Sequence, residues 1–112
     1  MKYCIIISCN PNTNLSHTAL QFSKSVLDLK HQISLIFFQG DGVYHSLRVN
    51  NKDDKDWLEW LNLMSQNNVK LINCSSANIK RGLEIKDNSL IKVAGLGELI
   101  MAIKESDKVM KF

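Results

Sequence analysis

The chain has 112 residues, of which 45% are hydrophobic and 22% are charged, and its formal net charge is +3. These values predict one domain over residues 1–112, large enough to bury a core without disulfide bonds. The sequence contains no long run of like charge, which argues against a nucleic-acid-binding tail. It also lacks the stretch of about 20 successive apolar residues that a bilayer-spanning helix needs.

The N-terminal half of the chain alternates apolar runs with amphipathic segments. Residues 2–8 are almost entirely apolar and β-branched, which predicts a strand buried on both faces. Turn residues follow, and Thr13 or Asn14 can cap a helix whose apolar side chains recur at steps of three and four residues. The other elements expected in this half are a buried strand (33–38), a loop (39–42), and a short helix or irregular segment (43–49).

The C-terminal half continues the same alternation. Asp53 or Asp54 is expected to cap an amphipathic helix, and Ser75 or Ser76 a shorter helix that ends near Gly82. The other elements expected in this half are strands at 69–73, 91–94 and 107–112, and a helix that follows a turn at 95–97.

This order of strands and helices predicts an α/β fold. We expect a three-layer sandwich, in which helices cover both faces of a mostly parallel five-stranded sheet whose strand order the sequence does not give. Ligands and reactive groups of such sheets collect beyond the carboxyl ends of the strands. Cys9 and Cys74 both lie at that edge, whereas Cys4 lies within the first strand and is expected in the core.

The N-terminal apolar run and the cysteine count bear on the compartment. The run is too short for the core of a signal peptide, and three cysteines are an odd set for a disulfide framework. We therefore expect a soluble cytoplasmic protein that does not contact a membrane.

Cys74 is the leading candidate for a reactive residue. It ends an expected strand, so its sulfur can be exposed, and it opens a helix whose free N–H groups and dipole stabilise a thiolate. Lys80 and Arg81 are close enough in sequence to add positive potential. The alternative is that Cys74 is a small, partly buried residue without a chemical role, and position alone does not decide between the two.

Other residues give weaker signals. Cys9 occupies an equivalent place after the first strand, but neither a helix start nor a basic residue follows it directly. Its spacing from Cys4 does not fit a zinc site. His17 could act as a base near the Cys9 loop, although an exposed histidine without such a role is the simpler interpretation. The 95–97 turn lacks the third glycine of a dinucleotide-binding loop, and we expect neither a metal nor a cofactor.

Several short motifs together carry a resemblance to a known family. In their order and spacing the chain resembles, nearly end to end, the DsrE-like family of sulfur-relay proteins, and within it the TusD branch. The motifs are Phe37-Phe38 with Gly42-Val43-Tyr44, Asn73-Cys74 with Lys80-Arg81-Gly82, Gly95-Leu96-Gly97-Glu98-Leu99, and the closing strand from Asp107 to Phe112.

The resemblance implies an activity and a set of partners. Cys74 matches the family's persulfide-carrying cysteine, with Lys80 and Arg81 as residues that steer a partner and Cys9 as the secondary candidate. Sulfur would come from a TusA-like donor and pass, with a TusE-like acceptor, toward 2-thiouridine synthesis at the wobble position of tRNA. The resemblance also implies a heterohexamer with TusB-like and TusC-like subunits, two copies of each, without direct tRNA binding.

Two alternatives and one departure remain open. The chain could be a structural subunit with inert cysteines, or a DsrE-type subunit in bacterial sulfur oxidation. The segment between Gly82 and Gly95 is shorter than in TusD-like chains, which leaves open how the site is covered and which surface it presents to a partner.

Overall fold

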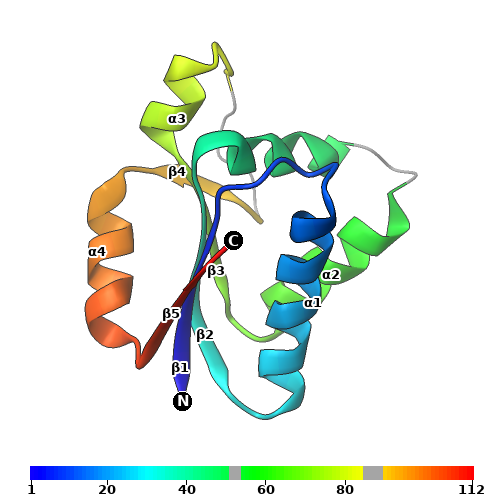
Figure 1. Cartoon of the computed structure of the whole chain (residues 1–112), viewed down its shortest axis with the longest axis vertical. Coiled ribbons are helices and arrows are strands. Elements are labelled where there is room, and N and C mark those ends of the chain that lie inside the picture. The colour runs from blue at the N-terminus through cyan, green and yellow to red at the C-terminus, as the bar shows by residue number, and fades with distance from the viewer. Residues whose placement is uncertain (51–53, 85–89) are drawn as a thin grey trace.

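The computed structural model describes residues 1–50, 54–84 and 90–112 of the chain. Its centre is a five-stranded sheet in which every pair of neighbouring strands is parallel, in the order β4–β3–β2–β1–β5 (Figure 1). From β1 the chain adds β2, β3 and β4 on one side, and β5 then pairs with the free side of β1. The strands are β1 (Lys2–Ile7), β2 (Gln32–Phe38), β3 (Lys70–Cys74), β4 (Lys92–Ala94) and β5 (Lys108–Lys111).

Helices cover both faces of this sheet, which confirms the predicted α/β three-layer sandwich. Helices α1 (Asn14–Asp28) and α2 (Lys55–Gln66) lie on one face and α4 (Leu96–Glu105) on the other (Figure 1). The 3₁₀ helix η1 (Gly40–Asn50) and the short helix α3 (Ser75–Lys80) lie at the end of the sheet where β1, β2 and β3 finish. Within the described ranges, no helix has the length and apolar character that crossing a bilayer requires.

The core is divided by the sheet into two clusters. Ile5 and Ile7 of β1 face α1 and α2, whereas Cys4 and Ile6 face α4, as the period of two along a strand requires. The α1/α2 cluster is the larger and contains Trp57 and Trp60. Cys4 is fully buried, so its predicted place in the core is confirmed. The α4 cluster consists of Cys4, Ile6, Leu35, Phe37, Val43, Ile72, Cys74, Ala77, Leu99 and Ala102.

The segment after β2 differs from the expected loop. Residues 39–42 were expected to be irregular, yet η1 already begins at Gly40 and runs without a break to Asn50. Gly40 has a φ of +52°, and a Cβ atom on Gly42 would lie 1.9 Å from the Ile7 carbonyl oxygen. The two glycines therefore let the chain turn tightly over the end of β1, which an open loop would not do.

The helix caps follow the expectations in two of three cases. Thr13 caps α1 by accepting a hydrogen bond from the Ser16 N–H, and Asp54 caps α2; Asp53, the other candidate, lies outside the described residues. Neither serine caps α3, because β3 passes directly into the helix without a turn. Cys74 itself is the N-cap residue, and its side chain makes no capping hydrogen bond.

Candidate functional site

The Cys74 side chain lies where the sheet ends and α3 begins. Cys74 is the last residue of β3, is in register with Ala94 of β4, and is followed at once by α3. The expectation that its sulfur is exposed was wrong, since only 5% of the residue is accessible. The reason is that Cys74 points toward the face covered by α4, where it packs in the same cluster as Ala77 and Leu99.

The sulfur has one polar neighbour among the described residues. The Cys74 Sγ lies 3.2 Å from the Oγ of Ser76, which is in the first turn of α3 and is itself exposed. The first backbone N–H groups of α3, which have no partner within the helix, lie on the same side because Cys74 is the N-cap residue. The arrangement can therefore support nucleophilic sulfur chemistry, provided that a second sulfur can reach the site.

Arg81 is held by an ion pair and does not contact the Cys74 sulfur. Its Nε and Nη2 donate to Asp41 Oδ1 at 3.1 and 2.9 Å, and its Nη1 donates to the Ala77 carbonyl at 3.3 Å. The guanidinium thus ties the C-terminal end of α3 to the start of η1. Lys80, the other predicted basic residue, is exposed at the last position of α3 and forms no described hydrogen bond with the sulfur.

A buried polar network next to Cys74 was not found from the sequence. The Asn73 Nδ2 donates to the Val43 carbonyl at 3.1 Å, to the Ser46 Oγ at 2.9 Å, and at 3.4 Å to Asn78 Oδ1. These bonds join η1 to the junction of β3 and α3. An asparagine within an otherwise apolar strand was the available signal, because a buried amide needs hydrogen-bond partners.

Two atoms of this network remain unsatisfied. Within the described part of the chain, Asn73 Oδ1 and Asn78 Nδ2 are buried and have no hydrogen-bond partner. Each such atom costs about 1–3 kcal/mol relative to a satisfied one. The described neighbours of the junction that holds Cys74 thus leave part of its hydrogen-bonding capacity unfilled.

The other two cysteines are separated from Cys74. Cys4 is fully buried within β1, and burial raises the pKa of the Cys4 thiol, which disfavours its reactive thiolate. Cys9 is half-buried and packs against the α1/α2 cluster, on the opposite side of the sheet from Cys74. The structure therefore does not bring the primary and the secondary candidate together.

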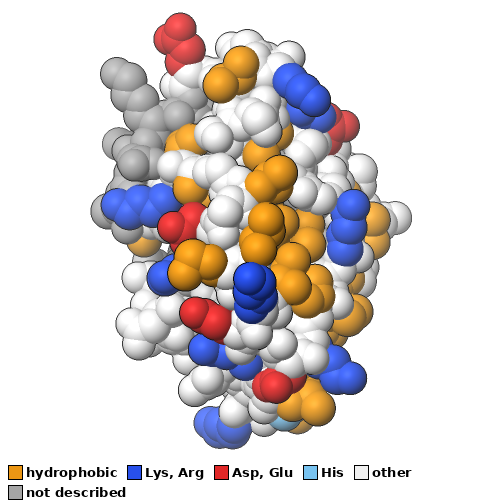
Figure 2. All heavy atoms as spheres, turned by 90° about the vertical axis from the view of Figure 1, so that its left-hand side faces the viewer, with side chains coloured by type: hydrophobic (Ala, Val, Ile, Leu, Met, Phe, Trp, Pro, Cys, Tyr) orange, Lys and Arg blue, Asp and Glu red, His pale blue; other side chains and the backbone are white. Residues whose placement is uncertain are grey.

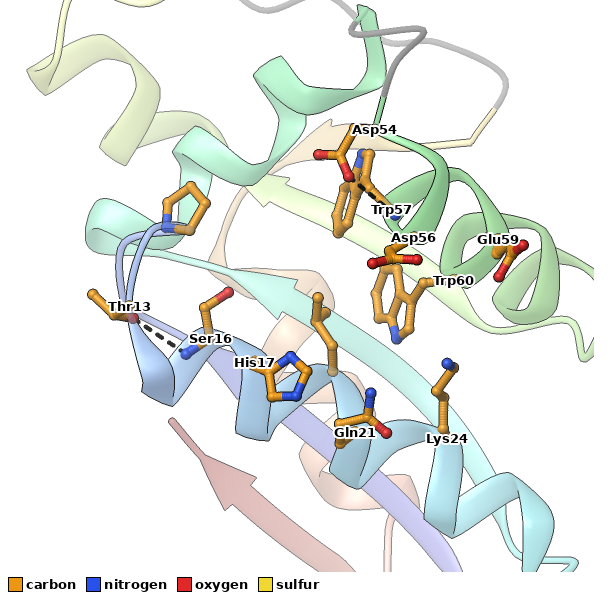
Figure 3. Close-up of a pocket in the computed structure, with 12 residues that line it drawn as sticks. Thr13, Ser16, His17, Gln21, Lys24, Asp54, Asp56, Trp57, Glu59 and Trp60 are labelled. Carbon is orange, nitrogen blue, oxygen red and sulfur yellow. Dashed lines mark hydrogen bonds between the residues drawn. The ribbon is translucent and has the colours of Figure 1, made fainter.

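A groove between α1 and α2 lies on the other face of the sheet. It has a volume of about 280 Å³, and His17 and Lys24 of α1 face Asp56 and Glu59 of α2 across it (Figure 3). His17 is exposed at this groove and lies far from the Cys74 side of the sheet. Among the described residues, no three His, Cys, Asp or Glu side chains are grouped so that they could hold a metal ion.

A second histidine, His45 of η1, is buried at the base of α1. Its Nδ1 lies 2.8 Å from the Gly42 carbonyl, which can only accept, so Nδ1 carries the proton. The Nε2 then accepts from the Ser16 hydroxyl at 2.7 Å. This pair fixes η1 against α1, and it was not predicted because Ser16 and His45 are far apart along the chain.

Comparison with known proteins decides the family. A family model described as "DsrE/DsrF-like family" matches residues 1–112. The chain belongs to the DsrE/DsrF-like family. The resemblance inferred from the motifs is thereby confirmed.

Named relatives of this DsrE/DsrF-like chain are sulfurtransferases. The protein named "Sulfurtransferase TusD" from Buchnera aphidicola subsp. Schizaphis graminum is 31% identical, and the match covers 100% of both chains. The protein of the same name from Sodalis glossinidius is 28% identical over 100% of this chain and 98% of that one. Both alignments extend over 128 positions, against 112 residues here, so the relatives contain insertions.

The fold of the family is also seen in a solved structure. The YchN protein of E. coli superposes with a TM-score of 0.78 over 100% of both chains, at 20% sequence identity. That identity supports the DsrE/DsrF-like fold alone. The expectation about the segment between Gly82 and Gly95 falls in part on residues 85–89, which lie outside the described residues.

Proposed function

We propose that this DsrE/DsrF-like chain is a sulfurtransferase subunit that carries sulfur as a persulfide on Cys74. The observation that carries the proposal is the place of Cys74, at the carboxyl end of a parallel strand and the start of a helix, in a chain matched end to end by proteins named sulfurtransferase TusD. Of the three cysteines, Cys4 is fully buried in the core, and Cys9 packs against the α1/α2 cluster on the other face of the sheet.

The chemistry needs only thiol exchange. The Cys74 thiolate attacks the outer sulfur of a donor persulfide, the donor S–S bond breaks, and the donor leaves as a thiolate. An acceptor thiolate then attacks the outer sulfur of the Cys74 persulfide, and Cys74 is released as the thiolate it was at the start. No electron is gained or lost over the cycle, so neither a metal nor a redox cofactor is required.

The burial of Cys74 sets a condition on this reaction. With 5% of the residue accessible, a donor sulfur cannot approach in line until α3 or a neighbouring segment shifts. The features that permit such a shift are the short length of α3 and the unsatisfied amide atoms of Asn73 and Asn78 beneath it. Sulfur transfer is thus proposed to accompany the docking of a donor or acceptor at the α3 end of the sheet.

We further propose the partners of a TusD-type subunit. Sulfur would arrive from a TusA-like donor and leave to a TusE-like acceptor, toward 2-thiouridine synthesis in tRNA and without tRNA contact by this chain. Lys80, exposed on α3, is suited to steer an acidic partner, while Arg81 acts mainly through Asp41.

An exposed apolar surface supports assembly with TusB-like and TusC-like subunits in a heterohexamer. Figure 2 shows hydrophobic side chains gathered in a band on the side of the molecule where α4 lies. Exposed apolar patches of this kind mark protein interfaces. The exposed hydrophobic residues of α4, together with Val109 of β5, form what we call the α4–β5 surface: Leu96, Ile100, Met101, Ile103 and Val109.

Sulfur loading of cysteine variants tests the activity. The purified protein is incubated with a donor protein that carries a persulfide labelled with radioactive sulfur, and bound label is measured after separation without reductant. Wild type and Cys9→Ser are expected to take up label, whereas Cys74→Ser takes up none while retaining the wild-type unfolding midpoint. Loading of Cys74→Ser would contradict the assignment and point to Cys9.

The burial of Cys74 also favours a second candidate function, that of a structural subunit with inert cysteines. Alkylation at neutral pH separates the two functions. If the chain is a sulfur carrier, Cys74 should be alkylated at least as fast as a free thiol once the donor is bound. If the chain is a structural subunit, Cys74 should be alkylated more slowly than a free thiol under all conditions.

A further inference from the structure

We propose that the Ser76 hydroxyl takes part in the sulfur chemistry by donating a hydrogen bond to the sulfur of Cys74 when that sulfur carries negative charge. The inference rests on the proposed function and adds a residue to it. Ser76 would assist twice, because the same sulfur is the nucleophile when sulfur is loaded and the leaving group when it is passed on.

The charge on the sulfur decides which atom donates the hydrogen bond. The Ser76 Oγ lies 3.2 Å from the Cys74 Sγ, within reach of a hydrogen bond to sulfur. With the thiol form of Cys74, either atom can donate. A thiolate has no proton to give, so in that form the hydroxyl must be the donor.

The burial of Cys74 strengthens its hydrogen bond with Ser76. Cys74 is 95% buried within the α4 cluster, so little water can solvate its charge, and the guanidinium of Arg81 is engaged by Asp41 and the Ala77 carbonyl. In the described part of the chain, the Ser76 hydroxyl is the polar side-chain group in contact with the sulfur. Hydrogen bonds to a charged group are stronger than neutral ones, more so where water is excluded.

Both steps of the relay gain from the same hydrogen bond. In loading, the Cys74 thiolate forms a bond to the outer sulfur of the donor persulfide, and the donor thiolate leaves. In unloading, the acceptor thiolate forms a bond to that outer sulfur, the Cys74 S–S bond breaks, and both of its electrons return to Cys74. A hydroxyl that stabilises the charge on Cys74 keeps more of it as thiolate before loading and makes it a better leaving group afterwards.

The pH dependence of Cys74 alkylation tests the inference. Wild type and Ser76→Ala are alkylated over a series of pH values, and Cys74 modification is followed in its own peptide by mass spectrometry. The fraction present as thiolate at neutral pH should fall about tenfold in Ser76→Ala, so that half-maximal labelling moves up by about one pH unit. The plateau rate at alkaline pH reports access to the sulfur and separates a change in ionisation from a change in exposure.

Two further variants show whether the hydroxyl itself is responsible. Ser76→Thr retains a hydroxyl and should restore the wild-type profile, whereas Ser75→Ala removes the neighbouring serine of the same helical turn and should leave the profile unchanged. The inference is overturned if the Ser76→Ala profile superposes on that of wild type, or if Ser75→Ala shifts it equally.

Sulfur loading separates this inference from the proposed function. If wild type loads sulfur while the Ser76→Ala profile is unshifted, the role of Ser76 fails and the function stands. If the profile shifts while wild type cannot be loaded from the persulfide donor, the function fails and the hydroxyl–thiolate contact stands. The expected result is loading by both proteins, with Ser76→Ala about threefold slower at neutral pH, because the greater nucleophilicity of a more basic sulfur offsets part of the tenfold loss of thiolate.

Discussion

Gly42 shows at the scale of a single residue how tightly the candidate site is built. A Cβ atom at this position would lie 1.9 Å from the oxygen and 2.8 Å from the carbon of the Ile7 carbonyl, both of them backbone atoms that cannot turn aside. The turn from β2 into η1 therefore depends on the absence of a side chain. Since η1 supplies two of the three hydrogen-bond acceptors of Asn73, the glycine also helps to fix the residue that precedes Cys74.

Replacing Gly42 by alanine should destabilise the fold severely. We expect Gly42→Ala to lower the free energy of unfolding by about 3 kcal/mol, because η1 must move away from β1 to relieve the overlap. Gly97→Ala is the matched control: nothing lies within 4 Å of an added Cβ there, and alanine favours the helix. Urea denaturation measures both, and equal midpoints for the two variants would contradict the role of Gly42.

The buried thiol of Cys4 predicts a pH dependence of stability. Burial raises the pKa of Cys4, so the folded chain keeps a proton that the unfolded chain releases as the pH rises through the ordinary range of a thiol. The free energy of unfolding therefore falls with rising pH there, by at most about 1.4 kcal/mol per pH unit from this group.

Cysteine variants isolate this contribution. Denaturation of wild type and Cys4→Ala over an alkaline pH series should give a shallower loss of stability for the variant, although the variant is less stable at neutral pH. Parallel slopes for wild type and Cys4→Ala would show that burial of Cys4 does not control its proton.

Residue-scale features were predictable from the sequence where they depend on local pattern. The place of Cys4 in the core follows from its position inside an apolar run, and it was predicted correctly. The burial of Cys74 was not, because it depends on Leu99 of α4, which is distant along the chain. For the same reason the ion pair of Arg81 with Asp41 could not be foreseen, and Arg81 was expected to steer a partner.

At the scale of elements, the ion pair between α3 and η1 governs how easily Cys74 is reached. Asp41 receives two hydrogen bonds from the Arg81 guanidinium, and the same guanidinium holds the Ala77 carbonyl of α3. Loss of the pair should free α3 more than it destabilises the whole chain, because the pair lies partly in solvent, where such bridges contribute little to stability.

The variant Asp41→Asn tests the role of this pair. We expect alkylation of Cys74 at its alkaline plateau to become about threefold faster, with the free energy of unfolding lowered by less than about 1 kcal/mol. Lys80→Gln is the control, since it removes a neighbouring charge of α3 that is not part of the pair. Unchanged access to Cys74 in Asp41→Asn would mean that another contact holds α3 in place.

The elements themselves were largely predictable, and their junctions were not. Strands and helices were predicted close to their observed positions, because buried helices show apolar residues at every third or fourth position whereas the buried strands are short, almost wholly apolar runs. The start of α3 was misplaced because Ser75 and Ser76 are good capping residues, yet β3 runs directly into the helix and leaves Cys74 as the N-cap. The glycines of residues 39–42 suggested a loop, whereas they permit a tight 3₁₀ turn over β1.

At the scale of the whole molecule, strand order places the site away from the free edge of β5. Pairing of β3 with β2 and β4 puts Cys74 within the sheet rather than at its border, whereas β5 lies at an edge with Val109 and Met110 exposed. A single sequence does not reveal the order of strands in the sheet, since parallel strands joined by crossover helices can be arranged in several ways. The sequence therefore does not predict that α4 and β5 together form an exposed apolar surface.

Charge substitutions on α4 test whether that surface is an interface. When the chain is co-expressed with TusB-like and TusC-like subunits, Ile100→Glu should reduce the assembly to smaller species in light scattering, because a buried carboxylate opposes association. Ile79→Glu, at an equally apolar and more exposed position on α3, is the control and should leave the assembly intact. A full-size assembly of Ile100→Glu would show that α4 lies outside the interface.

The site of sulfur attachment is the central claim, and peptide mapping of the loaded protein tests it most directly. After incubation with a persulfide donor and blocking of free thiols, the digest is analysed by mass spectrometry without reductant. We predict one additional sulfur atom on the peptide that contains Cys74, and none on the peptides that contain Cys4 or Cys9. Additional sulfur on either of those peptides, with Cys74 unmodified, would contradict the account.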